Sequence, residues 1–175
     1  MIRKAVENDL DRISGIYNEI HEEEKAKRLT VGWQSGIYPV RATAESALKR
    51  GELFVFEEDS KVLASAIINQ SQVDVYKDGK WLYNAPDSSV MVLHTLTVSP
   101  KAGKRGIGKA FVAFYEAYAR ENGCTVLRID TNAKNTVARS FYQKLGFREA
   151  GIVSCVFNGI PGVNLVLLEK SVTSG

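Results

Sequence analysis

The sequence predicts an α/β protein in which helices cover the faces of a central, mixed and mostly antiparallel sheet. Apolar residues recur at helical spacing over residues 10–20 and again over residues 107–118. Two short apolar runs, at 53–56 and 62–68, flank a polar turn, as in a β-hairpin. A longer run at 90–98 leads through a glycine-rich segment into the second amphipathic helix. Because no linker or repeat interrupts the 175 residues, we expect one domain over 1–175.

The predicted order of elements is β-α-α-β-β-β-α-β-α-β-β. A strand at 2–6 opens the chain, and a helix capped by Asn8 follows it. After an aromatic loop at 33–38, a helix at 43–50 ends at Gly51, a residue suited to a helix C-terminus. The second half adds a strand at 126–129 and a helix at 135–145. Closing strands at 147–156 and 163–168 surround the turn Asn158-Gly159.

Composition excludes several classes of function. The net charge of +3, from 23 basic and 20 acidic residues, is too small for a nucleic-acid-binding stripe. No apolar run reaches the roughly 18 residues of a membrane span, and the first residues lack the apolar stretch of a signal peptide. Cys124 and Cys155 lack the close spacing of a redox or metal motif and are expected to be reduced thiols. We therefore expect a cytoplasmic protein that binds neither membrane nor nucleic acid.

The segment between the strand at 90–98 and the next helix has the features of an anion site. Gly103, Gly106 and Gly108 allow positive φ and let backbone N–H groups converge at the helix N-terminus, where the dipole favours an anion. The basic side chains around them are Lys101, Lys104, Arg105 and Lys109. A pyrophosphate is the expected ligand, although the same pattern also suits a simple turn before a helix.

Two nucleotide-binding motifs are close to this segment but incomplete. Gly103 and Gly108-Lys109 have the spacing of a phosphate-binding P-loop, yet Ala110 replaces the Ser or Thr that would hold Mg²⁺. A dinucleotide fingerprint fails because Phe111 stands at its third glycine position. A nucleotide binder is therefore kept only as an alternative.

At this loop the sequence resembles the GCN5-related N-acetyltransferase (GNAT) family. The resemblance is carried by Leu96-Thr97-Val98 with Gly106-Ile107-Gly108 within residues 90–123, and by a second motif within 126–147 that runs from Asn135 to Phe147. The chain departs from the family at Gly103, where Arg or Gln is usual. The family's pyrophosphate contacts are largely made by backbone amides, so we expect binding to persist, with Lys104 or Arg105 compensating.

The resemblance implies acetyl-CoA as the co-substrate, without a metal. It implies that the backbone of Leu96, Thr97 and Val98 binds the pantetheine arm as an added strand would. It also implies that Asn135 touches the cofactor and that the strand at 126–129 diverges to admit the thioester. The residues expected around the pyrophosphate are Gly103, Lys104, Arg105, Gly106, Ile107, Gly108 and Lys109.

Direct acyl transfer to an amine needs a neutral amine, a stabilised oxyanion and a proton for the leaving thiolate. Tyr142 stands at the family position of the general acid, although its helical spacing also suits a packing residue. His94 is the candidate base, or else a core histidine, because it alternates in phase with Val92, Leu96 and Val98. A water is a further candidate for the base, as are Glu19, Glu22 and Glu23 at the end of the first helix, whose carboxylates otherwise suit a solvated surface. By resemblance, the N–H of Leu96 stabilises the oxyanion.

The acceptor is not identified by the sequence. Trp33 and Tyr38 are candidate walls of its pocket, or else pack locally within their loop. A small-molecule amine and a protein or peptide amine remain open, and the resemblance also allows a homodimer. A non-catalytic acyl-CoA sensor on the same fold is the main alternative to an enzyme.

Overall fold

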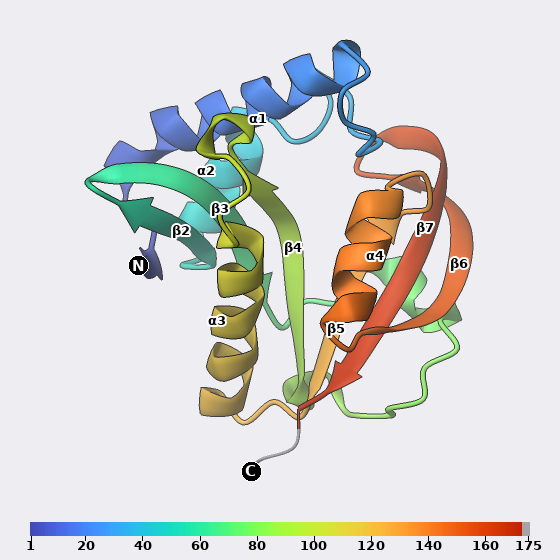
Figure 1. The fold of residues 1–175 in the computed structure, drawn as a ribbon. Coiled ribbons are helices and arrows are strands. Elements are labelled where there is room, and N and C mark those ends of the chain that lie inside the picture. The colour runs from blue at the N-terminus through green and yellow to red at the C-terminus, as the bar shows by residue number, and fades with distance from the viewer. Residues whose placement is uncertain (173–175) are drawn as a thin grey trace. The chain divides into compact units, whose positions relative to one another are not determined.

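The computed structural model describes residues 1–172, and its helices and strands follow the predicted order (Figure 1). The strands are β1 (Ile2–Lys4), β2 (Leu53–Glu58), β3 (Lys61–Asn69), β4 (Val90–Val98), β5 (Val126–Asn132), β6 (Arg148–Phe157) and β7 (Ile160–Ser171). The helices are α1 (Leu10–Lys25), α2 (Arg41–Lys49), α3 (Ile107–Glu121) and α4 (Thr136–Lys144). Short 3-10 turns occupy Glu7–Asp9, Asp74–Asp78, Asp87–Ser89 and Pro100–Ala102.

The strands form a seven-stranded sheet in the order β1-β2-β3-β4-β5-β7-β6. Strands β4 and β5 are parallel, with Val90 opposite Val126 and Leu93 opposite Ile129. The pairs β1–β2, β2–β3, β5–β7 and β6–β7 are antiparallel. The predicted fold class, a mixed and mostly antiparallel sheet with helices, is therefore confirmed.

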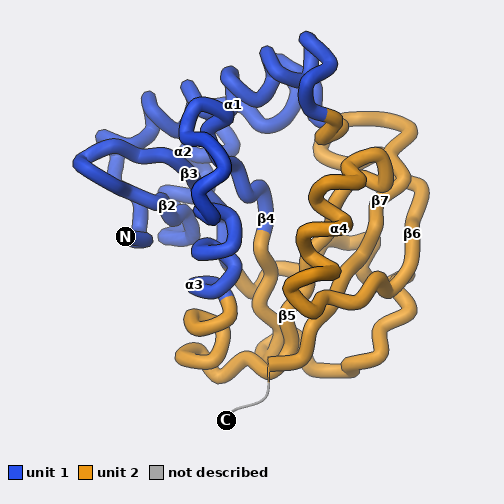
Figure 2. Tube along the Cα trace, in the orientation of Figure 1, with its two compact units in different colours: residues 1–29, 33–68, 94–115 blue, residues 30–32, 69–93, 116–175 orange. Residues whose placement is uncertain are grey.

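The residues group into two compact units (Figure 2). Unit 1 contains Met1–Leu29, Trp33–Ile68 and His94–Tyr115, and unit 2 contains Thr30–Gly32, Asn69–Leu93 and the chain from Glu116 onward. Strand β4 and helix α3 contribute residues to both units.

In unit 1, helix α1 buries an apolar stripe in which Ile13 and Ile16 are completely inaccessible to solvent. Asn8 does not cap this helix as predicted, because it lies inside the turn Glu7–Asp9. The carboxylate of Asp9 instead accepts the backbone N–H of Val6 at 2.8 Å. Arg3 donates to the same carboxylate at 2.8 Å, which ties the start of the helix to β1.

In unit 2, β6 and β7 form the predicted hairpin around Asn158-Gly159. Both residues have positive φ (51° and 79°), as the favoured two-residue hairpin turn requires. Strand β7 is longer than the predicted 163–168, because its pairing with β5 extends as far as Val126 opposite Ser171. Its backbone hydrogen bonds, rather than its apolar run, set its length.

The connection between β3 and β4 folds onto the strands of unit 2. Glu169 of β7 is fully buried and accepts the backbone N–H groups of Leu82 at 2.7 Å and of Tyr83 at 2.9 Å. Arg148 of β6 pairs with the same carboxylate at 2.5 Å. A single buried charge thus fixes a segment that has little regular structure of its own.

Candidate functional site

Strand β4 contains one left-handed residue, Thr95, which the sequence analysis did not predict; this departure from extended backbone is called the bulge below. Thr95 has φ of 51°, a left-handed conformation that costs a β-branched residue about 1–3 kcal/mol. Thr95 departs from the extended backbone that the predicted alternation of His94 with Leu96 and Val98 assumed, yet these three residues are alike in being half-buried. His94 itself is half-buried, and its assignment as the base stays a prediction.

The glycine-rich segment after β4 has the backbone of an anion-binding loop. Gly103 (φ 75°, ψ −179°) and Gly106 (φ 74°) have positive φ, and Ile107 begins helix α3 directly afterwards. A Cβ atom at either glycine would meet no atom within 4 Å, so conformation, and not crowding, requires glycine there. The loop combines an open surface, a helix N-terminus and two glycines of positive φ, and this combination fits a pyrophosphate.

The basic side chains of this loop differ in their contacts. Lys104 and Lys109 are exposed. Arg105, expected to compensate for Gly103, donates from Nη1 to the Glu58 carboxylate at 2.5 Å and from Nε to the carbonyl of Ala102 at 3.0 Å. This arginine stabilises the loop itself, so Lys104 is the better placed of the two to meet a phosphate.

Glu19 supports the start of this loop. Its carboxylate accepts from Arg12 at 2.7 Å and from the hydroxyl of Ser99 at 2.5 Å. Burial raises the pKa of Glu19, but the hydrogen bonds from Arg12 and Ser99 outweigh it and hold the pKa below its ordinary value. Glu19 is therefore an ionised anchor for Ser99, which suits it poorly as the base considered from sequence.

Tyr142 lies on helix α4, which Asn135 caps by accepting the N–H of Ala138 at 3.1 Å. The residue is 7% exposed, and its ring centroid lies 5.1 Å from that of Phe141 and 5.8 Å from that of Phe147. Burial first, and then the charge of Asp130, raise the pKa of Tyr142 well above its ordinary value. The phenol is thus a packed residue that keeps its proton at neutral pH, and the two interpretations of its role are compatible.

Asp130, near the end of β5, was missed as a site residue. The hydroxyl of Tyr76 donates to its Oδ2 at 2.6 Å. Burial raises the pKa of its carboxyl to about 6, and the Tyr76 hydrogen bond only partly opposes this. A carboxyl with that pKa near a phenol can exchange protons at neutral pH. Its position immediately after the predicted strand 126–129 was the available sequence signal.

Trp33 and Tyr38, the predicted acceptor walls, pack edge to face with ring centroids 6.2 Å apart. The hydroxyl of Tyr38 is hydrogen-bonded to Oγ1 of Thr95 at the bulge. Thr97, two residues further along β4, is buried and its hydroxyl lies 2.8 Å from that of Ser65 on β3. Local packing is therefore present, and the role toward an acceptor stays a prediction.

The candidate residues divide between the units. Unit 1 holds the residues expected to bind cofactor from Leu96 to Lys109, together with Trp33, Tyr38 and His94 (Figure 2). Unit 2 holds Asn135 and brings Tyr142 under the electrostatic influence of Asp130.

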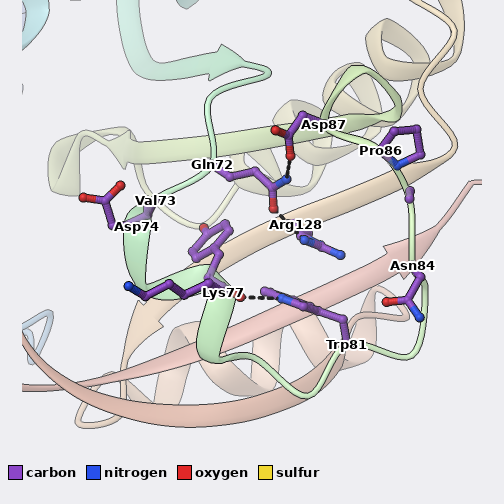
Figure 3. A pocket seen from close by; sticks show the side chains of 11 residues that line it. Gln72, Val73, Asp74, Lys77, Trp81, Asn84, Pro86, Asp87 and Arg128 are labelled. Atoms are coloured by element: carbon purple, nitrogen blue, oxygen red, sulfur yellow. Dashed lines mark hydrogen bonds between the residues drawn. The ribbon is translucent and has the colours of Figure 1, made fainter.

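Unit 2 also contains a cavity of about 640 Å³ (Figure 3). Its lining includes the guanidinium of Arg128, whose Cζ lies 4.0 Å from the ring centroid of Trp81. Gln72 joins Arg128 at 2.5 Å to Asp87 at 2.6 Å. The lining residues do not include any predicted catalytic or cofactor residue.

The cysteines do not have the properties of nucleophiles. Cys124 is buried, Cys155 is half-buried, and both are unbridged. Burial raises the pKa of both thiols, and the charge of Asp130 raises that of Cys155 further. Both are therefore protonated at neutral pH.

Within residues 1–172 no cluster of three or more His, Cys, Asp or Glu side chains could hold a metal ion. Among the same residues no helix has the length and apolar character to cross a membrane.

Unit 1 thus contains a glycine-rich loop at a helix N-terminus that suits an anion, and unit 2 contains a buried tyrosine on a capped helix. The sequence model of the acetyltransferase (GNAT) family matches residues 13–147, and the chain belongs to this family. The predictions of the family and of an acyltransferase are therefore confirmed.

Relatives and solved structures agree with this assignment. An uncharacterized N-acetyltransferase of Methanocaldococcus jannaschii is 32% identical over 76 residues, which are 43% of this chain and 34% of the relative. An aminoglycoside N(6')-acetyltransferase type 1 of Salmonella typhimurium is 34% identical over 67 residues, 38% of this chain and 46% of the relative. The matched segments thus span between a third and a half of these relatives.

Among solved structures, a GNAT-family acetyltransferase of Streptococcus agalactiae has a TM-score of 0.82 at 24% identity, covering 99% of this chain and 96% of that one. A Salmonella typhimurium protein described with its cofactor acetyl-CoA has a TM-score of 0.68 at 16% identity, covering 100% and 95%. These similarities show the fold.

Proposed function

We propose that this protein transfers an acetyl group from acetyl-CoA to the nitrogen of an amine within a ternary complex. The observation that carries the proposal is the loop from Gly103 to Gly106, whose two positive-φ glycines leave open space directly before helix α3, whereas Gly108 lies within the first turn of that helix. Backbone N–H groups at this position suit the pyrophosphate of acetyl-CoA, and Lys104 and Lys109 add charge. The thioester supplies an acyl group activated for attack.

The reaction then needs two proton transfers. The amine nitrogen adds to the thioester carbonyl, and the carbon–sulfur bond breaks as the tetrahedral intermediate collapses. Tyr142 is proposed to donate its proton to the departing sulfur, because it stands at the family position of the general acid and its phenol is protonated at neutral pH. The backbone N–H of Leu96, which follows the bulge, is proposed to stabilise the oxyanion.

The base that removes the amine proton is proposed to be Asp130 or His94. Asp130 is supported by its pKa of about 6, which leaves it ionised at pH 7 and able to return its proton to solvent. Replacing each residue in turn distinguishes the two candidate bases. If Asp130 is the base, kcat/KM of the wild type falls below about pH 6, and Asp130→Asn abolishes this fall. If His94→Asn does so instead, the base is the histidine.

The acceptor is proposed to be an amine, with no narrower class favoured. The names of matched proteins supply a test panel: an aminoglycoside, phosphinothricin and a peptide with N-terminal alanine. Release of CoA thiol from acetyl-CoA would be followed with each of these amines and with spermidine. An acceptor among them would give turnover above the rate without amine.

Calorimetric titration with acetyl-CoA, desulfo-CoA and ATP–Mg²⁺ tests the donor. We expect both CoA compounds to bind and ATP–Mg²⁺ not to bind. Binding of acetyl-CoA without transfer to any amine of a broad panel would favour an acyl-CoA sensor. Absence of CoA binding would refute the proposed function.

A further inference from the structure

We propose that Tyr38 is a positioning residue that acts through Thr95 to hold the bulge of β4 in the shape required for acetyl transfer. This inference rests on the proposed function, because the bulge matters to catalysis only if the thioester lies beside it. All the residues that carry it belong to unit 1.

Thr95 needs an external partner to keep its conformation. Its φ of 51° is rarely adopted by a β-branched residue, so the backbone alone favours a return to the extended form. Its hydroxyl is hydrogen-bonded to the hydroxyl of Tyr38, a contact that an extended Thr95 would orient differently. Tyr38 therefore selects the left-handed conformation.

Tyr38 is itself held in place. Its backbone N–H donates to the carbonyl of Gln34 at 3.0 Å, and its ring packs edge to face on Trp33. The carbonyl of the next residue, Pro39, lies 2.9 Å from Nε2 of His21, a buried side chain on α1. The tyrosine hydroxyl is thus presented from a loop that is fastened to a helix.

The strand beyond the bulge is anchored separately. The hydroxyl of Thr97 contacts that of Ser65 at 2.8 Å, and Ser99 donates its backbone N–H to the carbonyl of Leu63 at 2.8 Å. With these positions tied to β3, the rotation at Thr95 decides the direction of the Leu96 amide. Tyr38 would thereby set the oxyanion donor without touching the reacting atoms.

The test combines amide hydrogen exchange with acetyl-CoA titration, both followed by NMR on the full chain. In Tyr38→Phe we expect exchange at Leu96 to accelerate about tenfold and the acetyl-CoA-induced shift of that amide to shrink. The dissociation constant of desulfo-CoA should change less than about twofold, because the phosphate loop is unaltered. Amides of β2 should keep their exchange rates, whereas a general loss of structure would accelerate them too.

Replacements at Thr95 provide the matched comparison. Thr95→Val removes the hydroxyl at similar volume and should reproduce the effect of Tyr38→Phe. In the double variant, exchange at Leu96 should be no faster than in either single variant. Thr95→Ser keeps the hydroxyl and should restore the wild-type amide. Ser154→Ala, which removes a hydroxyl bound to Asn164 at 2.7 Å on the β6–β7 hairpin, should leave Leu96 unchanged.

Unaltered exchange at Leu96 in Tyr38→Phe would overturn the proposal. So would an effect of Tyr38→Phe that Thr95→Val fails to reproduce, because Tyr38 would then act by another route. Exchange in the protein without ligand answers this question even if acetyl-CoA does not bind. A failure of the proposed function is therefore distinguishable from a failure of this inference.

Discussion

Tyr142 and Asp130 show how burial assigns opposite protonation states to two acidic groups of one unit. The phenol keeps its proton because burial and the charge of Asp130 raise its pKa. The carboxyl of Asp130, with a pKa of about 6, is mostly ionised at pH 7. A donor and an acceptor of protons thus coexist at neutral pH, as general acid–base catalysis requires.

Replacing Tyr142 by Phe removes only the hydroxyl and keeps the ring contacts with Phe141 and Phe147. If the phenol protonates the leaving thiolate, kcat should fall by about 10²-fold or more. The dissociation constant of acetyl-CoA should stay within about twofold, as measured by calorimetry. Unchanged kcat at saturating substrates would contradict the acid role and leave Tyr142 as a packing residue.

Replacing Asp130 by Asn should stabilise the protein at neutral pH. The unfolded carboxyl has a pKa of about 3.9, and the folded one of about 6, so the native state binds more protons between these values. The free energy of unfolding of the wild type therefore falls as pH rises through this window. Asn cannot ionise, and the variant should gain roughly 1–3 kcal/mol at pH 7.5.

The measurement is urea unfolding at pH 4, 5.5 and 7.5, where the gain should shrink toward pH 4. Glu121→Gln, which removes an exposed carboxylate at the end of α3, is the control and should show no such trend. A gain in the free energy of unfolding that does not depend on pH would show that ionisation of Asp130 does not destabilise the folded protein.

At the level of elements, the glycine-rich loop before α3 depends on backbone conformation at single glycines. Gly106→Ala places a Cβ on a residue with φ of 74°, which costs about 1–2 kcal/mol. We expect either a lower melting temperature or a reshaped loop that binds acetyl-CoA about tenfold more weakly. Gly162→Ala is the matched control, because that glycine has φ of 67° and equally open surroundings.

Calorimetry on both glycine variants distinguishes a general loss of stability from a specific loss of acetyl-CoA binding. Gly162→Ala should lose similar stability and bind acetyl-CoA normally. Equal weakening of binding in both variants would mean that the loop has no special role.

The order and type of the elements could be predicted because their signals are local. Periodicity, the Asn135 cap and the Asn158-Gly159 turn each specify structure within a few residues. The bulge at Thr95 could not be predicted, since the apolar run 90–98 continues through it and its partner Tyr38 is distant in sequence. The pKa of Asp130 likewise depends on burial and on Tyr76 from another segment. Contacts remote in sequence therefore determine the parts of the site that were missed.

At the level of the whole molecule, the two units share β4 and α3, so we expect one cooperative unfolding transition. The chain contains two tryptophans, Trp33 in unit 1 and Trp81 in unit 2. In Trp33→Phe the fluorescence reports unit 2, and in Trp81→Phe it reports unit 1. Each urea curve should coincide with the circular dichroism curve of the same variant, and separated midpoints would contradict a single cooperative unit.

The conformation of Gly103 also constrains how this sequence can change over generations. At φ of 75° and ψ of −179° it occupies a region that is essentially reserved for glycine. Introducing the Arg or Gln expected from the family resemblance would therefore be harmful unless neighbouring residues had already remodelled the turn. A single codon change is then insufficient, and the order of substitutions, more than the fitness of the final sequence, would determine whether a lineage acquires that side chain.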